Sequence, residues 1–253
     1  MPNALVIDVV VAARRMLAKG IVELELQNQN GAALPAFSAG SHIDVLLPGN
    51  VIRQYSLWNN PSETHRYCLG VLEEPKGRGG SSAMHQLKKG AKLQISAPRN
   101  NFELNPAAQN TMLFAGGIGI TPILSMAQSL HDQGAEFEMH YCARNKGRMA
   151  FRKLLDAAPF SDRVHLHFDN GPKAQRLDLD ALSEKPHPGT HLYVCGPSGF
   201  MDAVLCSAKD AWPVDTLHRE YFSADVAEAN GEDRAFKIRI DSTGDVLDDP
   251  ADK

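Results

Sequence analysis

The residues best suited to chemistry begin with a glycine-rich run, Gly116–Pro122 (GGIGITP), which lies between a strand-like and a helix-like segment. Glycines let the backbone approach a ligand closely, and the unpaired N–H groups at a helix N-terminus attract an anion. A pyrophosphate is the expected ligand. The run is not the G-x-G-x-x-G dinucleotide fingerprint, because Pro122 occupies the third glycine position. A tight strand–helix turn without a ligand is the alternative.

A second candidate is Arg53–Leu57 (RQYSL) on a predicted strand. Arginine holds a phosphate bidentately, tyrosine lies along a flavin ring, and a serine hydroxyl reaches a ring nitrogen. By itself, the pentapeptide is explained equally well as surface and packing residues.

A third candidate is Gly77–Ser82 (GRGGSS), whose N–H groups and two hydroxyls suit a phosphate. A flexible glycine loop is the alternative there.

Two further groups lie at the ends of predicted strands. Cys195–Ser198 (CGPS) ends a buried strand, and parallel α/β sheets bind ligands at the carboxyl ends of their strands. We therefore expect Gly119 and Cys195 on the same rim, although a buried cysteine on its own is usually a small apolar residue. Glu220–Phe222 (EYF) places an acid and two aromatics after the last predicted strand, where a packed domain edge is the alternative.

Composition argues against several classes of protein. A net charge of −4 disfavours nucleic acid binding, which usually requires a basic excess. The four cysteines form no C-x-x-C pair, so we expect no metal site, no disulfide framework and reduced thiols in a cytoplasmic protein. The apolar run 4–13 contains Asp8 and has no basic region before it, which indicates neither a signal peptide nor a membrane span.

The elements that must position these groups change in kind near Asn105. Before it, period-two alternation and Pro/Gly/Asn turns predict strands. Six short strands without a long helix predict an antiparallel β-barrel over residues 1–104. The six strands are expected at 7–13, 22–26, 43–47, 54–58, 67–72 and 92–96.

Residues 105–224 alternate strand-like and helix-like runs, which predicts an α/β domain with a parallel sheet and helices on both faces. Thr121 is the expected N-cap of a helix that runs to His131, with Pro122 at its first position and Gly134 at its exit. The other strands are expected at 111–115, 137–142, 164–168, 191–195 and 216–221, and further helices at 149–157, 177–183 and 198–211.

In this order and spacing, the motifs resemble those of the ferredoxin–NADP reductase superfamily, in the branch of the phthalate dioxygenase and vanillate demethylase reductases. The resemblance covers residues 3–253. It implies a flavin-binding barrel (1–104), a nicotinamide-binding α/β domain (105–224), and at 225–253 a linker and the truncated start of a plant-type [2Fe–2S] ferredoxin domain. It also implies FMN as the flavin and a terminal oxygenase as the partner of a Rieske-type oxygenase system.

The resemblance assigns a role to each matching residue. It places Ser56, Cys195 and Glu220 at the reacting centre and the other residues around the two cofactors. The flavin would contact Arg53, Tyr55, Ser56, Gly70, Val71 and Phe222, and its phosphate Gly79, Gly80, Ser81 and Ser82. The nicotinamide cofactor would contact Gly116, Gly117, Gly119, Thr121, Arg144, Asn145, Cys195, Gly196 and Pro197.

Two departures from the family pattern bear on these expectations. Relatives that use NADH carry an acid after the arginine, where this chain has Asn145 with Lys146 and Arg148 nearby. We expect NADH, with NADPH as the alternative. The C-x₄-C-x₂-C run of a plant-type iron–sulfur domain is missing. A chain truncated within that domain is the preferred explanation, and a natural two-domain reductase is the alternative.

The expected activity is hydride transfer from the nicotinamide to the flavin, with no acid–base dyad required. The cofactors supply the chemistry, while the protein fixes their approach and excludes water. Two rivals stay open. One is a non-catalytic flavin-binding redox sensor, which would not need the Gly116–Pro122 loop. The other is an FAD enzyme that reduces free flavins or ferredoxin.

Overall fold

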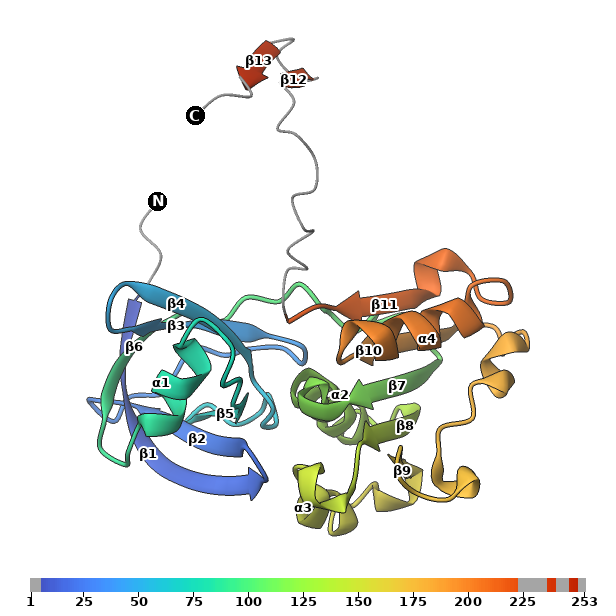
Figure 1. Ribbon diagram of the computed structural model, residues 1–253, viewed down its shortest axis with the longest axis horizontal. Coiled ribbons are helices and arrows are strands. Elements are labelled where there is room, and N and C mark those ends of the chain that lie inside the picture. Colours follow the sequence, from blue (N-terminus) through green and yellow to red (C-terminus); the bar gives the residue numbers. More distant parts are fainter. Residues whose placement is uncertain (1–5, 223–235, 240–245, 250–253) are drawn as a thin grey trace. The chain divides into compact units, whose positions relative to one another are not determined.

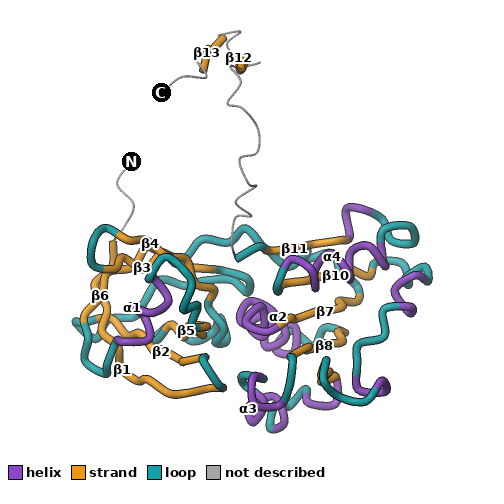
Figure 2. Tube along the Cα trace, in the orientation of Figure 1, coloured by secondary structure: helices purple, strands orange, loops and turns teal. Residues whose placement is uncertain are grey.

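A computed structural model describes residues 6–222, 236–239 and 246–249 (Figure 1). The chain forms two compact units, Met1–Phe222 and Ser223–Lys253. The larger unit contains two sheets, one antiparallel and one parallel, each with its own strands (Figure 2). The fold class expected from the sequence is therefore confirmed.

The first sheet is a six-stranded barrel in the order β4-β3-β6-β1-β2-β5, and its neighbouring strands pair antiparallel. A bridge between Leu57 and Leu69 joins its two edges. The alternation in β3 explains why the sheet closes around a core. Ile43 and Val45 are buried inside the barrel, and the residue between them faces outward. The elements are β1 Val6–Ala18, β2 Ile21–Asn28, β3 His42–Leu47, β4 Val51–Ser56, β5 Tyr67–Leu72, α1 Gly80–Gln86 and β6 Lys92–Ser96.

The second sheet has five parallel strands in the order β11-β10-β7-β8-β9. Successive residues of β7 point to opposite faces: Leu113 and Ala115 pack with α2, whereas Phe114 packs with α4. Helices therefore cover both faces, as expected from the sequence. The elements are β7 Asn110–Gly116, α2 Ile120–Asp132, β8 Glu136–Ala143, α3 Arg152–Asp156, β9 Val164–Phe168, β10 Thr190–Cys195, α4 Ser198–Ala208 and β11 Leu217–Glu220. Short 3₁₀ turns lie at Gly117–Gly119, Lys146–Arg148, Ser161–Arg163, Lys173–Gln175, Asp180–Ser183 and Val214–Thr216.

Helix α2 connects the two sheets. The side-chain amide of Gln128 donates to the carbonyl of Trp58 (2.7 Å), and the Ser125 hydroxyl donates to the carbonyl of Asn59 (3.1 Å). The ring of Trp58 also lies 4.7 Å, centre to centre, from that of Phe151. Since one apolar cluster includes residues of both sheets, the barrel and the α/β layer share a core.

Three expectations about helices were wrong. The helix after the glycine run begins at Ile120 with Gly119 as its N-cap, and Thr121 lies inside it with its hydroxyl donating to Ile118 O (3.1 Å). The helix expected at 149–157 is only α3, because buried Phe151 adopts a left-handed conformation (φ 59°) against Trp58. The helix expected at 177–183 is a 3₁₀ turn over Asp180–Ser183.

The smaller unit contains one antiparallel pair, β12 Phe236–Arg239 with β13 Val246–Asp249. Apart from these two strands, the predicted linker and domain start at 225–253 lie outside the described residues. Within the described chain, no helix is both long and apolar enough to cross a membrane.

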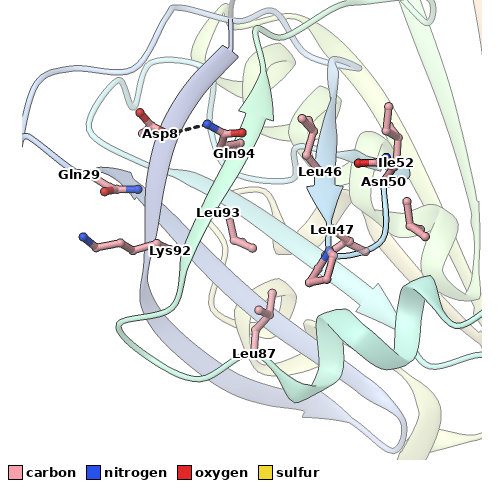
Figure 3. A pocket seen from close by; sticks show the side chains of 12 residues that line it. Asp8, Gln29, Leu46, Leu47, Asn50, Ile52, Leu87, Lys92, Leu93 and Gln94 are labelled. Carbon is pink, nitrogen blue, oxygen red and sulfur yellow. Dashed lines mark hydrogen bonds between the residues drawn. The ribbon is translucent and has the colours of Figure 1, made fainter.

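One groove opens on the barrel surface between β3 and β6 (Figure 3). These strands are paired only at Val45–Ile95 and Leu46–Gln94, so beyond these positions they diverge. Leu47, Leu87 and Leu93 are among its lining residues. None of the site residues predicted from the sequence lines it.

Candidate functional site

The glycine run and the end of β10 are packed together at one rim of the parallel sheet. A Cβ placed on Gly119 would collide with the carbonyl group of Cys195, and one on Gly196 would lie 2.9 Å from the Cα of Gly116. Gly116 itself leaves room for the ring of Phe200, which a Cβ there would approach to 2.6 Å. The expectation that Gly119 and Cys195 share a rim is therefore confirmed.

Not every glycine of this run serves packing. Gly117 has a left-handed backbone (φ 55°), and a Cβ on it would meet no atom within 4 Å. Its face is thus open to a ligand, while Gly119 is closed off by backbone. Pro197, at the N-terminus of α4, is exposed on the same rim.

Thr121 faces the barrel rather than open space. It is buried, and a Cβ on Gly70 of β5 would lie 2.8 Å from its Cγ2 and 3.4 Å from the ring of Phe151. Gly70 therefore permits close packing between the two sheets. The side chain of Val71 is buried in the barrel core, and its carbonyl oxygen lies 2.9 Å from Nε2 of His85.

On the barrel side, Arg53 of β4 lies against the loop that begins α1. Its guanidinium donates to the carbonyls of Ile52 (2.8 Å) and Arg78 (3.4 Å), and its side chain occupies the space that a Cβ on Gly80 would need. Gly79 precedes the helix in a left-handed conformation (φ 80°) with open space beside it. Two motifs that the sequence suggested separately are therefore adjacent.

The hydroxyls of this loop differ in availability. The Ser81 hydroxyl accepts the backbone N–H of Glu74 (3.0 Å), which holds the loop closed, whereas the Ser82 hydroxyl makes no hydrogen bond with any described residue. On the strand, Tyr55 is half-buried, and burial raises the pKa of its phenol to about 12. Tyr55 therefore stays protonated at neutral pH.

The barrel and the rim of the parallel sheet meet at Glu220, the last residue of β11. Glu220 is paired with Cys195 in the parallel register of β10 and β11, and its carboxyl group interacts with the hydroxyl of Ser56 on the barrel. Burial raises the pKa of Glu220 to about 7, and the Ser56 hydroxyl opposes this shift. Burial, followed by the charge of Glu220, raises the pKa of the Cys195 thiol well above its usual range.

This junction can hold a proton at neutral pH. A carboxyl group with a pKa near 7 both gives and takes a proton readily at that pH. Cys195 is fully buried and stays a neutral thiol, so it is a packing and hydrogen-bonding group rather than a nucleophile. The three residues placed at the reacting centre by the sequence are thus brought together.

Sequence reasoning missed one residue at this junction, His42 of β3. Its imidazole Nδ1 lies 3.8 Å from Oε1 of Glu220, and only 6% of its side chain is exposed. The turn predicted at Pro48–Asn50 is a signal that could have found His42. A tight hairpin centred on Gly49 pairs His42 with Ser56, which was already a candidate residue. Alternation alone marks His42 only as outward-facing.

The remaining predicted residues lie at the edges of the site. Arg144 is exposed and Asn145 is half-buried just after β8, and the Arg144 carbonyl accepts the N–H of Asn170 (3.2 Å). Phe222 is 46% exposed, and Tyr221 lies under the guanidinium of Arg219 (5.3 Å to the ring centre). Neither aromatic therefore forms a packed domain edge, which was the alternative interpretation of Glu220–Phe222.

All four cysteines are free thiols, and among the described residues no group of three or more potential ligands is placed to hold a metal ion.

Comparison with known proteins matches residues 113–205 to the oxidoreductase NAD-binding domain family. Over 249 residues the chain is 51% identical to a vanillate O-demethylase oxidoreductase of a Pseudomonas species, covering 98% of this chain and 78% of that protein. It is 36% identical to the phthalate dioxygenase reductase of Burkholderia cepacia, covering 96% of this chain and 76% of that protein.

A solved phthalate dioxygenase reductase, described as a modular structure for electron transfer from pyridine nucleotides to [2Fe–2S], superposes with a TM-score of 0.83. The two share 35% identity, and the match covers 97% of this chain and 77% of that one. The extent of these matches leaves one assignment: the chain belongs to the ferredoxin–NADP reductase superfamily, among the NAD-binding flavoprotein oxidoreductases that serve as reductase components of oxygenase systems.

Proposed function

We propose that the chain transfers hydride from NADH to FMN and passes the electrons on to the terminal component of a Rieske-type oxygenase system. The observation that carries this proposal is the position of Glu220, which lies beside Ser56 of the barrel and next to Cys195 of β10. The residues predicted for the flavin and those predicted for the nicotinamide thus meet at one point. With its four thiols free, the chain is suited to the cytoplasm.

The barrel residues fit a flavin phosphate. Arg53 supplies a positive charge directly above Gly80, and Gly79 presents an open backbone face. A guanidinium and adjacent N–H groups are the donors that phosphate prefers. We assign Arg53, Gly79, Gly80, Ser81 and Ser82 to the phosphate. Because Ser81 already accepts a backbone bond, Ser82 is the freer hydroxyl.

The ring end of a flavin fits the same junction, because the carboxyl oxygen Oε2 of Glu220 is buried and has no hydrogen-bond partner among the described residues. A buried polar atom without a partner costs about 1–3 kcal/mol, which a bound ligand with a donor would relieve. We assign Tyr55, Ser56 and Phe222 to the ring, with the backbone at Gly70 and Val71 nearby.

The open face of Gly117 fits a pyrophosphate, with Gly116, Gly119 and Thr121 shaping the loop behind it. Cys195, Gly196 and Pro197 would border the nicotinamide, and Arg144 and Asn145 the adenosine ribose. We propose NADH rather than NADPH, although Lys146 and Arg148 follow closely. We also propose that residues 1–104 and 105–224 act as the flavin and nicotinamide domains.

When bound, the flavin supplies the chemistry by accepting a hydride and releasing electrons singly. The chain's own residues orient the two cofactors and manage the proton. Ser56 keeps Glu220 directed toward the barrel, and Glu220 exchanges a proton near neutral pH. Buried Cys195 excludes water from the rim where the nicotinamide would lie.

A simple set of measurements tests this function. We expect the purified protein to carry a flavin that mass spectrometry identifies as FMN, and to oxidise NADH with ferricyanide as the acceptor. Release of FAD instead would favour the alternative function, an FAD enzyme that reduces free flavins or ferredoxin. A bound flavin that NADH fails to reduce would leave the redox sensor as the better account.

Electron delivery to an oxygenase is proposed to need a [2Fe–2S] domain of the kind that residues 225–253 would begin. Residues 1–253 carry no C-x₄-C-x₂-C run, so we expect a protein of these residues alone to support turnover of the oxygenase poorly, and to support it well when a separate ferredoxin domain is supplied. Full coupled turnover by the chain alone would mean that electrons pass directly from the flavin to the oxygenase.

A further inference from the structure

His42 is a buried ionisable group that no role assigned so far explains. It lies on β3 opposite Ser56, it is 5% exposed, and within the part of the chain that the structure describes neither imidazole nitrogen has a hydrogen-bond partner. Leaving a buried polar atom unpaired costs about 1–3 kcal/mol. A phenylalanine would fill similar space without this penalty, which points to a use for the imidazole.

The groups that face His42 come from three strands and from the segment after β6. Glu220 of β11 approaches Nδ1 to 3.8 Å, and Ser56 of β4, which is paired with His42, also interacts with the carboxyl group of Glu220. Arg99, which follows β6, exchanges both backbone hydrogen bonds with His42 (2.8 and 3.0 Å). The Nη2 atom of its guanidinium donates to both carboxylate oxygens of Asp44 on β3, at 2.9 and 2.8 Å.

These surroundings favour neutral forms of both His42 and Glu220. Burial, followed by the positive charge of Arg99, lowers the pKa of His42, and Asp44 opposes this only in part. Burial raises the pKa of Glu220 to about 7. A neutral carboxylic acid is a donor and a neutral imidazole is an acceptor, so the two groups complement each other with one proton between them.

We propose that His42 and Glu220 share a single proton between Nδ1 and Oε1, and that His42 thereby acts as a positioning residue for proton transfer through Glu220. The proposal rests on the proposed function. The 3.8 Å separation must shorten to a hydrogen bond for this, and Glu220 is the last residue of β11, where we expect its side chain to have room to rotate.

The reaction requires such a proton exit. NADH gives up two electrons and one proton with its hydride, and two one-electron acceptors take only the electrons. One proton per NADH therefore remains and must leave as the electrons are passed on to those acceptors. Ser56 lies next to Glu220, so the proton would pass from the Ser56 side to Glu220, while the proton that Glu220 already holds moves to His42 Nδ1. The imidazolium so formed would then release one proton to water, which restores the single shared proton.

The first test uses the flavin-free protein and needs no activity. Two groups that share a proton release the last one at higher pH than either does alone, by about one pH unit or more when the coupling is strong. Nuclear magnetic resonance of the His42 ring should therefore show an upper titration step in the wild type that moves down by about one unit in Glu220→Gln. An unchanged His42 titration would overturn the proposal.

The second test follows the pH dependence of NADH oxidation with ferricyanide. Both His42→Phe and His42→Asn should shift the profile, because neither side chain titrates. Should His42→Phe fail to fold, His42→Asn, which keeps a polar group of similar reach, decides the matter alone. A normal profile in His42→Asn would reduce His42 to a structural role and overturn the proposal. The matched control is His165→Phe on β9, a ring that contacts Glu138 away from this junction.

The two failures are distinguishable. If the wild type neither retains a flavin nor oxidises NADH, the proposed function falls and this inference falls with it. If the wild type does both and the His42 variants keep its pH profile, only the shared proton is wrong.

Discussion

The two glycine-rich loops of this protein carry similar residues but need glycine for different physical reasons. Before α2, a Cβ on Gly119 would meet the carbonyl of Cys195 and the backbone nitrogen of Gly196, which cannot move without displacing β10. At the start of α1, a Cβ on Gly80 would meet only the side chain of Arg53, at its Nε, Cγ and Cδ atoms, and a rotation of that side chain can move them away. The loop before α2 is thus held by backbone packing, and the loop at the start of α1 by an arginine side chain.

This difference predicts the largest effect at Gly119. Gly119→Ala should lower the free energy of unfolding by about 3 kcal/mol or more, because the backbone around it leaves no space for the methyl group. The KM for NADH should rise in the same variant. Gly117→Ala is the matched control, since its Cβ enters open space and only the left-handed backbone (φ 55°) is strained, by roughly 1–2 kcal/mol. Urea unfolding of both variants measures the difference. Equal stabilities would remove the distinction between the loops.

The next effect is a pH-dependent gain of stability in Glu220→Gln. The folded pKa of Glu220 is raised to about 7, so between the unfolded pKa near 4.5 and pH 7 the unfolded chain has lost this proton while the folded protein keeps it. Wild-type stability therefore falls over this window as the pH rises. Glutamine does not ionise, so the flavin-free variant should exceed the wild type by up to about 3 kcal/mol at pH 8 and match it near pH 4. A constant difference at both pH values would contradict the raised pKa.

On the flavin side, Arg53→Ala should weaken FMN binding by roughly tenfold or more, because a charge-assisted hydrogen bond contributes about 1.5–3 kcal/mol. Arg53→Lys keeps the charge but not the bidentate geometry, so its dissociation constant for FMN should lie between those of the wild type and Arg53→Ala. Fluorescence titration of the flavin-free proteins with FMN gives the three dissociation constants. Wild-type retention of FMN by the alanine variant under dialysis would take Arg53 out of the phosphate site.

The smallest effect concerns the choice of nucleotide. We expect kcat/KM to favour NADH by no more than about tenfold, or 1.4 kcal/mol. Asn145 cannot repel a 2′-phosphate as an acid would, and Arg144, Lys146 and Arg148 add positive charge. Steady-state kinetics with both nucleotides settle the preference, and a higher value for NADPH would reverse it.

Local patterns predicted the sheets well because alternation and turns are encoded in neighbouring residues. The strands expected at 67–72, 92–96 and 164–168 have the bounds that the structure gives them. The adjacency of Gly119 and Cys195 followed from a general property of parallel sheets. These features needed no knowledge of distant contacts.

What the sequence did not reveal depends on contacts between the two sheets. The shortness of α3 arises from the packing of Phe151 on Trp58, and the closeness of Gly70 to Thr121 from the meeting of β5 with α2. His42 was missed for the same reason, because its partner Glu220 lies far along the chain, on β11. The turn at Pro48–Asn50 pairs His42 with Ser56, but no local pattern predicts the contact with Glu220.

The central claim is that the barrel and the α/β layer bring a flavin and a nicotinamide together at Ser56, Glu220 and Cys195. The most direct measurement is anaerobic stopped-flow mixing of the flavin-loaded protein with NADH, followed by the visible absorbance of the flavin. We predict bleaching in a single turnover, at a rate that saturates with NADH and falls in Gly119→Ala. A flavin absorbance that NADH leaves unchanged would contradict the account.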